Sequence, residues 1–480
     1  MVTQTALPPA LAQIQRDAVG RLLQRFPLIT DLGERFTDAG FEIALVGGGV
    51  RDAVLGRELS ADIDLTTNAR PADSLAIMND WGDAVWETGI RFGTVAAQRG
   101  GTSWEVTTYR ADAYDHDSRK PDVQFGDSLT QDLYRRDFTV NAMAVRLPSL
   151  EFVDQNGGLI DLSQGRLRTP GPAHESFSDD PLRMLRAARF TSQLGLVIDP
   201  AGLAAAAEMV DRLKIVSAER VQAELSRLLL GEHPRRGLEV LTATGLADVV
   251  LPELPKLQLE IDEHHHHKDV YEHSLTVLDQ AIALEDDGPD LVLRMAALMH
   301  DVGKPKTRRF EGNGSVSFHH HEVVGARMSR KRLKALRYSN DFTEDVARLV
   351  ELHLRFHGYG DGEWSDSAVR RYVRDAGPLL DRLHKLTRAD CTTRNKRRAN
   401  ALRRSYDGLE ERIAVLAQQE ELAAIRPELD GNQIMAITGW PAGPKIGKAY
   451  NYLLELRLEQ GPIGLPATEE ALRAWVATQD

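Results

Sequence analysis

The sequence predicts an α/β head followed by a long, almost entirely helical body. From Phe41 to about Leu147, short apolar runs of strand length alternate with turns and helical patterns. From about Pro181 onward, apolar residues recur at helical spacing and are interrupted only by short polar or Gly/Pro-rich segments. This change of period along the chain separates a mixed domain from an all-helical region.

The composition is that of an ordinary soluble globular protein, with 480 residues, 42% hydrophobic and 27% charged content, and room for three or four domains. No apolar run approaches the roughly 18 residues of a membrane span, and the first residues lack the pattern of a secretory signal. Cys391 is the sole cysteine, which excludes an intrachain disulfide and suits a reducing compartment. We therefore expect a cytoplasmic protein with no membrane partner.

The formal net charge of -12 argues mildly against nucleic-acid binding as a property of the whole surface. Binding requires only a local basic face, and the stretch from Leu383 to Ser405 is rich in arginine and lysine. A solvated helix face explains this stretch equally well. The charge therefore leaves nucleic-acid binding open.

The elements follow in order from the spacing of apolar residues. Residues 1 to about 40 are expected to be helical, because the apolar side chains between positions 22 and 32 follow helical spacing. Four runs are expected to be strands, namely Ile43–Val46, Ile63–Thr66, Thr94–Ala97 and Trp104–Thr108. The segment Tyr109–Gly126 is dense in Asp, Arg, Ser and Pro, which favours a mobile loop.

The first expected strand runs into three glycines, Gly47 to Gly49, and a helix is expected from Val50. Glycines let backbone N–H groups approach a phosphate closely, and the N-terminus of a helix adds a partial positive charge. A turn of this kind is a weak signal by itself. Together with the carboxylates that follow, it indicates a nucleotide site.

Those carboxylates are Asp62 and Asp64, which point to one face because side chains alternate along a strand. Two like charges this close are costly unless a cation lies between them, and a pair of divalent metals is the usual solution. Such a pair fits phosphoryl transfer, where one metal lowers the pKa of the attacking hydroxyl and the other neutralises the leaving pyrophosphate. The alternative reading is a turn followed by a helix cap.

Two polar clusters lie downstream. The first combines cations with hydrogen-bonding groups and consists of Arg135, Arg136, Asp137 and Asn141. This mixture suits phosphate and ribose recognition, although an interdomain ion-pair cluster would look the same. In the second, Asp180 and Arg183 lie three residues apart at the start of an expected helix, and hence on one face of it.

Six motifs between roughly residues 40 and 235 occur in the order seen in class II tRNA nucleotidyltransferases. They are LVGGGVRD, DIDLTT, RFGT, DLYRRDFTVNAMA, DDPLRMLRAARF and ERVQAELSRLLL. The chain thus resembles the bacterial CCA-adding enzymes and their poly(A) polymerase relatives. This resemblance implies a polymerase-β-like nucleotidyltransferase head, a helical neck, body and tail, and template-independent addition of C, C and A from CTP and ATP to tRNA.

By this resemblance Asp62 and Asp64 hold Mg²⁺ and carry catalysis. The residues implied to contact the incoming nucleotide are Gly48, Gly49, Arg51, Arg91, Arg135, Asp137, Asn141, Asp180, Arg183, Arg186 and Arg189. Asp180 and Arg183 are implied to read the base. Cytosine and adenine each present an amino donor beside a ring-nitrogen acceptor, which suits a carboxylate and a guanidinium, whereas uracil and guanine invert that pattern.

The expected loop at 109–126 bears on which nucleotides are added. Family members that add only the two C residues tend to lack a flexible loop before the RRDFT motif. This chain has a long loop there, containing Asp112, Arg119 and Asp127 at its end. Full CCA addition is therefore favoured over addition of the two C residues alone.

The body carries four further motifs, HKDVYEHSLTVL, RMAALMHDVGKP, SFHHHEVVGA and LTRADC, which resemble those of an HD phosphohydrolase domain over about residues 265 to 395. The ligands expected from them are His273, His300, Asp301 and Asp390, and His321 or its neighbour His320 is expected to bind a second metal or a phosphate. Mixed imidazole and carboxylate ligation suits Mn, Ni, Zn, Fe or Mg, so the identity of this divalent metal stays open. Hydrolysis of a phosphate ester also stays open, since the domain could serve as a helical RNA-docking body.

The expected division is an N-terminal helical segment (1–40), a nucleotidyltransferase head (41–165), a helical neck for nucleotide and RNA recognition (166–260), an HD-type domain (261–400) and a helical tail (401–480). Three alternatives remain: a poly(A) polymerase, a phosphohydrolase with a vestigial head, and a non-catalytic RNA-binding module. The intact Asp62, Asp64 and RRDFT motif disfavour the last two.

Overall fold

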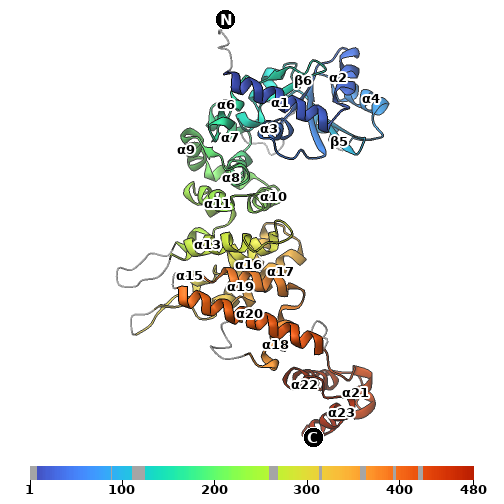
Figure 1. Cartoon of the computed structure of the whole chain (residues 1–480), viewed down its shortest axis with the longest axis vertical. Coiled ribbons are helices and arrows are strands. Elements are labelled where there is room, and N and C mark those ends of the chain that lie inside the picture. Colours follow the sequence, from blue (N-terminus) through green and yellow to red (C-terminus); the bar gives the residue numbers. More distant parts are fainter. Residues whose placement is uncertain are drawn as a thin grey trace. The chain divides into compact units, whose positions relative to one another are not determined.

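The structure, a computed structural model, describes residues 8–87, 89–110, 125–258, 269–312, 316–356, 364–392, 396–419 and 425–479. The chain forms two compact units, residues 1–250 and 251–480. In Figure 1 the first unit runs from blue to green and the second from yellow to red.

A seven-stranded sheet is the framework of the first unit, with the strand order β3-β4-β5-β2-β1-β6-β7. The strands are β1 (Ile43–Val46), β2 (Asp62–Thr67), β3 (Ala84–Trp86), β4 (Thr94–Arg99), β5 (Thr102–Thr108), β6 (Ala144–Leu147) and β7 (Phe152–Val153). Neighbours are antiparallel except β2 and β5, which run parallel. The parallel pair lies at the centre of the sheet and carries the carboxylates.

Helices surround and extend this sheet. Those of the first unit are α1 (Pro9–Arg25), α2 (Ile29–Asp38), α3 (Gly48–Leu55), α4 (Pro71–Trp81), α5 (Leu129–Tyr134), α6 (Gly158–Ser163), α7 (Ala173–Asp179), α8 (Leu182–Leu194), α9 (Pro200–Glu208), α10 (Ala218–Leu229), α11 (Pro234–Ala243) and α12 (Leu246–Val250). Short elements join them: 3-10 turns η1 (Ile90–Phe92), η2 (Thr139–Asn141) and η3 (Val210–Ile215), and the strand pair β8 (Arg166–Leu167) and β9 (Val197–Ile198).

Strand β1 is buried at every position because both of its faces are covered. Ile43 and Leu45 belong to the large core, which also contains residues of α1, α2 and α4. Ala44 and Val46 face a smaller core that includes Leu133 of α5. Two-sided burial fixes the end of β1, and so fixes where the glycine turn begins.

Aromatic packing anchors α1 and α4 on the sheet. The Trp104 ring on β5 meets the Trp81 ring edge-to-face at 5.0 Å between centroids, and the Phe26 ring at 6.3 Å. Such pairs add to the stabilisation that burial of the rings provides. Figure 1 shows α1 beside α3, the helix that follows the glycine turn.

The second unit is helical. Its helices are α13 (Val270–Ile282), α14 (Leu291–Met299), α15 (Lys304–Thr307), α16 (His321–Ala335), α17 (Asn340–Leu352), α18 (Asp366–Ala376), α19 (Leu380–Ala389), α20 (Lys396–Gln419), α21 (Gly431–Thr438), α22 (Pro444–Gln460) and α23 (Leu465–Val476). They are accompanied by η4 (Pro255–Leu257), η6 (Gly377–Leu379) and the antiparallel pair β10 (Arg309–Phe310) and β11 (Val316–Ser317).

Side-chain caps explain where several of these helices begin. Asp269, Asp290, Ser339 and Ser365 precede α13, α14, α17 and α18, and each accepts a hydrogen bond from a backbone N–H of the first turn. Helices α13, α14, α17 and α19 then pack on one another, while α21 to α23 share a separate small core. The ends of the packed helices bring the histidines and carboxylates of this unit together.

The predicted α/β head followed by a helical body is confirmed. All four expected strands are present, whereas β3, β6 and β7 were not expected, because runs of two to four residues carry little periodic signal. The helix after the glycines begins at Gly48 rather than Val50, since Gly47 is its N-cap. The five-part division of the chain stays a prediction.

Most of the expected loop, residues 111–124, including Asp112 and Arg119, lies outside the described residues. Its two ends are joined by a β-bridge between Arg110 and Phe125. Among the described helices, none combines the length and the apolar character that crossing a membrane requires.

Candidate nucleotidyl-transfer and metal sites

The Asp pair lies on one face of β2, as the alternation of side chains predicts. Asp62 and Asp64 are exposed, whereas Ile63 and Leu65 between and after them are buried in the core. The apolar residues of β2 therefore hold the strand in register while the carboxylates stay accessible.

A third carboxylate joins them from the neighbouring strand. In the parallel ladder Glu105 of β5 lies opposite Asp64, and Glu105 is exposed like the Asp pair. Desolvation raises the pKa of Glu105, and the charges of Asp64 and Asp62 raise it further. Sequence reasoning missed Glu105 as part of this edge. Glu105 occupies a position on the expected strand Trp104–Thr108 whose side chain points away from the buried face, and this is the signal that could have identified it. The sequence does not show, however, that this strand pairs with β2.

In this carboxylate edge (Asp62, Asp64 and Glu105), the pKa of Asp64 is raised. Desolvation raises its pKa, Arg136 opposes the rise, and Asp62 adds to it. Gly47 approaches both groups with a φ of 75°, and a Cβ placed there would lie 3.4 Å from Nη1 of Arg136 and 3.5 Å from Oδ2 of Asp64. The glycine turn, the carboxylate and the guanidinium thus meet at one point.

A chain of hydrogen bonds runs from α3 to α8. Arg51 donates from Nη1 to Oδ1 of Asn141 at 2.7 Å, and Asn141 donates to Oδ1 of Asp137 at 3.0 Å. Arg186 donates from Nε to Oδ2 of Asp137 at 2.8 Å. Burial alone would raise the pKa of Asp137, but Arg186 and Asn141 outweigh it and hold it at about 2. Four residues implied by the resemblance are therefore directly connected.

The same arginines surround one aromatic ring. The guanidinium carbons of Arg189, Arg51 and Arg186 lie 4.1, 5.4 and 5.6 Å from the centroid of Phe190. Glu224 of α10 contacts Nε of Arg189 at 2.9 Å and Nη1 of Arg186 at 3.6 Å. Burial and the like charge of Arg186 lower the pKa of Arg189 to about 10. Since carboxylates balance these cations, the arrangement orients the guanidinium groups more than it creates a net positive field.

The expectation that Asp180 and Arg183 share one helical face is wrong. Helix α8 begins at Leu182, and Asp180 has φ -141° and ψ 101°, an extended conformation. The reason is Pro181, because the residue before a proline is disfavoured in the helical region. Arg183 is helical, whereas Asp180 lies in the corner between α7 and α8.

The two side chains do not pair with each other either. Arg183 is buried and donates to Oγ of Ser176 at 2.8 Å and to the Arg135 carbonyl at 2.6 Å. The Asp180 carboxylate accepts from Arg220 of α10 at 2.7 Å. Each candidate base-reading group is thus held by its own partner from a different element.

The remaining predicted residues lie near these groups. Gly48 and Gly49 are the first residues of α3, and a Cβ at Gly49 would meet no atom within 4 Å, so space is open beside it. The backbone of Arg91 lies in η1, but its side chain lies outside the described residues.

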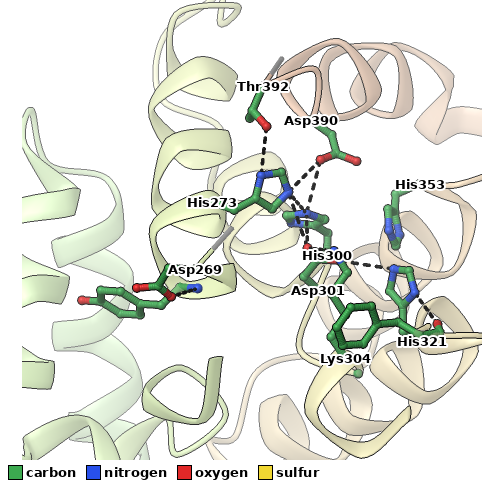
Figure 2. Close-up of polar contacts among 12 residues, drawn as sticks. Asp269, His273, His300, Asp301, Lys304, His321, His353, Asp390 and Thr392 are labelled. Carbon is green, nitrogen blue, oxygen red and sulfur yellow. Dashed lines mark hydrogen bonds and ion pairs between the residues drawn. The ribbon is translucent and has the colours of Figure 1, made fainter. Parts of the chain in front are cut away.

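The second unit contains two groups of three potential metal ligands. The first comprises His273, His300 and Asp390, and the second comprises Asp301, His321 and His353, with the ligand atoms of each group within 4.8 Å of one another. Figure 2 shows the four imidazoles converging on Asp301 and Asp390 from separate helices. All five ligands expected from the sequence are brought together. His353, the C-cap of α17, was missed, since a histidine at the end of an apolar helix resembles a core residue.

Backbone carbonyls fix the orientation of three of these rings. Nδ1 of His300, His321 and His353 lies 2.8, 2.8 and 2.7 Å from a carbonyl oxygen three residues earlier. Such a contact places the proton on Nδ1 and leaves Nε2 as a lone-pair donor, which is how metal-binding histidines are usually oriented. Nδ1 of His273 lies 3.2 Å from Oγ1 of Thr392.

The Nε2 atoms and carboxylates at the centre of the cluster face one another at close range. Nε2 of His353 is buried without a hydrogen bond, and Oδ1 of Asp301 and Nε2 of His321 form no well-aligned hydrogen bond, although they lie 3.2 Å apart. Nε2 atoms of His273 and His300 lie 3.3 Å apart. Buried polar atoms left unpaired are costly, and a cation coordinated by them would remove that cost. The donor set therefore fits divalent metal.

The charges in this cluster depend strongly on one another. Burial lowers the pKa of His300, but Asp301 and Asp390 outweigh it and raise the pKa to about 10. His353 has its pKa lowered to about 3 by burial and by the neighbouring His300. The pKa of Asp301 is well below its usual value, because His300 and Lys304 outweigh the effect of burial. The pKa of Asp390 is also well below its usual value, because His273 and His300 outweigh the effect of burial. Both carboxylates are therefore ionised, and His353 is neutral.

The fold and the carboxylate edge define a polymerase-type nucleotidyltransferase head, and the second unit has the ligand pattern of an HD domain. Family models agree in both regions. The "Poly A polymerase head domain" matches residues 43–168, the "Probable RNA and SrmB- binding site of polymerase A" matches 195–257, and the "HD domain" matches 270–395.

Curated relatives extend the likeness over the chain. An A-adding tRNA nucleotidyltransferase of Deinococcus radiodurans is 35% identical over 434 residues, which is 89% of this chain and 94% of the relative. A CCA-adding enzyme of Limosilactobacillus reuteri is 44% identical over 214 residues, 44% of this chain and about half (52%) of the relative's length. The chain belongs to the tRNA nucleotidyltransferase family of bacterial CCA-adding enzymes and poly(A) polymerase relatives, with a C-terminal HD domain.

Solved structures share the fold. A CCA-adding enzyme of Bacillus stearothermophilus in complex with CTP has a TM-score of 0.68 at 24% identity, covering 95% of this chain and 98% of that one. A Thermotoga maritima CCA-adding enzyme complexed with tRNA has a TM-score of 0.60 at 16% identity, covering 97% and 98%. At these identities the likeness concerns the fold alone.

Proposed function

We propose that this chain adds C, C and A from CTP and ATP to the 3′ end of tRNA without a nucleic-acid template. The carboxylate edge beside the glycine turn is the observation that carries the proposal. Family membership supports it. The nucleotides and tRNA that it would use are cytoplasmic, so we propose the cytoplasm as its compartment.

Asp62 and Asp64 are proposed to hold Mg²⁺, with Glu105 beside them. Desolvation, and after it mutual repulsion, raises the pKa of Asp64 and of Glu105, and a divalent cation beside them would favour their ionised forms. Carboxylate oxygens are ligands that Mg²⁺ prefers. When bound, such ions polarise phosphoryl oxygens and lower the pKa of a coordinated hydroxyl. Arg136, next to Asp64 and Gly47, adds a fixed positive charge beside the turn.

The residues proposed to hold the nucleotide fall into two groups. For phosphates and sugar they are Gly48, Gly49, Arg51, Arg91, Arg135, Asp137, Asn141, Arg186 and Arg189. For the base they are Asp180 and Arg183, in agreement with the hydrogen-bonding edge shared by cytosine and adenine. Their existing partners, Arg220 for the first and Ser176 for the second, would keep each group oriented before a base arrives.

Replacing Arg183 with Ala is expected to erode discrimination against UTP by about tenfold or more while slowing CTP addition less, because a lost hydrogen bond to the base affects selection most. The measurement is kcat/KM for CTP and UTP on a tRNA lacking CCA. Arg212→Ala, a matched change at an arginine of η3 that donates to the Ser178 carbonyl at 3.1 Å, should leave the ratio unchanged. Equal NTP selectivity in Arg183→Ala and in the parent would contradict the assignment.

Addition of the terminal A alone is a second candidate activity. It is favoured by one observation, that the relative matched over most of both chains is an A-adding enzyme. The CCA-adding relatives match more closely, but over about half of their length. The two activities differ in the nucleotides used, ATP alone or CTP and ATP, and in which tRNA 3′ ends are accepted.

The deciding experiment offers the protein three tRNAs, one lacking CCA, one ending in the first C and one ending in CC, with CTP, ATP and Mg²⁺. Sequencing of the added 3′ ends should give CCA on the first substrate, followed by arrest. Extension of the CC-ending tRNA alone would indicate an A-adding enzyme, and a long A tract a poly(A) polymerase. Absence of extension on all three substrates would contradict nucleotidyl transfer.

We further propose that the second unit holds divalent metal and hydrolyses a phosphate ester. Two adjacent ligand groups, in which buried Nε2 and carboxylate oxygen atoms face one another without well-aligned hydrogen bonds, support this. A metal bound in such a site would polarise a phosphoryl oxygen, and it would activate a bound water as the nucleophile. Mn²⁺, Ni²⁺, Zn²⁺, Fe²⁺ and Mg²⁺ all suit the mixed nitrogen and oxygen set, so no single metal is preferred.

A further inference from the structure

A small basic hollow lies beside α16 in the second unit. Its volume is about 200 Å³, and one wall consists of Met328, Lys331, Arg332 and Ala335. These positions are three and four residues apart and so share one face of the helix. Residues of α15 and of the segment around η4 form the other walls.

Three lysines from three separate segments meet at this hollow. Lys256 comes from η4, Lys306 from α15 and Lys331 from α16, and all three are exposed. Within the described ranges none of them has an ion-pair partner. The fourth cation, Arg332, is already neutralised by Glu253 through contacts of 2.8 and 3.2 Å.

This arrangement differs from an ordinary solvated lysine face. Like charges gathered at one hollow repel each other, and on a chain of net charge -12 there is no general excess of cations to account for them. The floor is apolar, since Val302 is buried and Pro305 and Met328 also line the hollow. A cavity with an apolar floor and convergent cations is typical of a binding site for an anion.

The volume of the hollow and the charge of its lysines restrict the class of ligand that it can bind. A volume of about 200 Å³ lies below the roughly 300 Å³ at which pockets for drug-sized ligands begin, and holds about six or seven waters at ~30 Å³ each. One or two phosphate groups fit, whereas a whole nucleotide does not. A phosphodiester carries a single charge, while a phosphomonoester or pyrophosphate carries two or more and matches three lysines better.

We propose that this hollow binds pyrophosphate or the terminal phosphate of a phosphomonoester. None of the residues that line the hollow belongs to either metal-ligand group, although Val302 follows Asp301 directly in the chain. Pyrophosphate is also the leaving group of the nucleotidyl transfer proposed above. Binding at the hollow does not depend on that activity.

The test is calorimetric titration of the full-length protein with inorganic pyrophosphate, in EDTA so that metal-dependent binding elsewhere is suppressed. Lys331→Glu and Lys306→Glu should each weaken binding by about tenfold or more, because each replaces an attractive charge with a repulsive one. Lys334→Glu is the matched control. It makes the same change on α16, outside the hollow and beside Glu344, and should alter the affinity less than about twofold.

Competition identifies the ligand class. AMP should displace pyrophosphate, and dimethyl phosphate, which carries a single charge, should not. Equal loss of affinity in Lys331→Glu and Lys334→Glu would overturn the proposal, as would pyrophosphate binding that none of the three variants alters. Displacement by dimethyl phosphate would reduce the hollow to a general anion site, and displacement by tRNA without a terminal phosphate would assign it to the RNA backbone. Both outcomes contradict the proposal.

Discussion

Replacing Asp64 with Asn is expected to abolish nucleotide addition, with a loss of kcat/KM on the order of a thousandfold or more. The change keeps the shape of the side chain and removes the charge that would hold Mg²⁺ at the carboxylate edge. The measurement is single-turnover addition of CTP to a tRNA lacking CCA. Asp80→Asn, the same substitution at an exposed carboxylate of α4 that pairs with Arg35, should retain full activity.

The same variant should be at least as stable as the parent in EDTA. The pKa of Asp64 is raised in the folded state, chiefly by desolvation. An acid with a raised folded-state pKa costs folding free energy at neutral pH. That cost shrinks as the pH falls below the raised value and is gone below the ordinary pKa of the unfolded chain. Asn removes the cost at every pH. Urea unfolding at neutral pH should therefore show an equal or higher midpoint for Asp64→Asn.

Measuring both nucleotide addition and the unfolding midpoint distinguishes a catalytic role of Asp64 from a structural one. Loss of activity with a lower unfolding midpoint would mean that Asp64 is a structural residue. Activity within about tenfold of the parent would remove Asp64 from the catalytic set, because loss of a group that acts in the transition state costs far more.

The sequence was informative about this edge where local rules decide the outcome. Asp62 and Asp64 share a face because a strand has a period of two, and Gly47 adopts a positive φ that other residues avoid. Glu105 could not be assigned in this way. Its position opposite Asp64 depends on the pairing of β5 with β2, which is a long-range choice that no local pattern encodes.

Residues that were expected on helices show the same limit, because local spacing alone did not determine where their side chains lie. Spacing placed Asp180 and Arg183 on one face, but Pro181 between them forces Asp180 out of the helix. Among the histidines, His320 and His321 are adjacent in sequence and equally plausible as ligands. In the structure His321 begins α16 and lies 3.2 Å from Asp301, whereas the His320 side chain is 83% exposed and lies 3.8 Å from Glu322.

Replacing His353 with Gln is expected to remove metal from the second ligand group, made of Asp301, His321 and His353, and to leave the first group occupied. His353 is buried, its pKa is lowered to about 3, and its Nδ1 is tethered to the Val350 carbonyl, so its Nε2 is available as a neutral ligand at any ordinary pH. Metal per chain after dialysis against Mn²⁺, measured by mass spectrometry, should fall by half.

His320→Gln is the matched control. It makes the same substitution in the same unit, at an exposed histidine outside both ligand groups, and should leave the metal content unchanged. Equal metal loss in both variants would mean that histidines bind Mn²⁺ non-specifically. Unchanged metal content in His353→Gln would exclude His353 as a ligand.

Hydrolysis gives the second readout for His353→Gln. If both groups act on one phosphate ester, turnover of bis-p-nitrophenyl phosphate with Mn²⁺ should fall by about a hundredfold, because the variant loses one of two charges at the phosphoryl group. CTP addition should be unaffected, since the carboxylate edge lies in the other compact unit. Asp64→Asn should show the reverse, with no addition and full hydrolysis. Loss of both activities in either variant would contradict two independent sites, because each substitution would then act through the stability of the whole chain rather than through its own ligands.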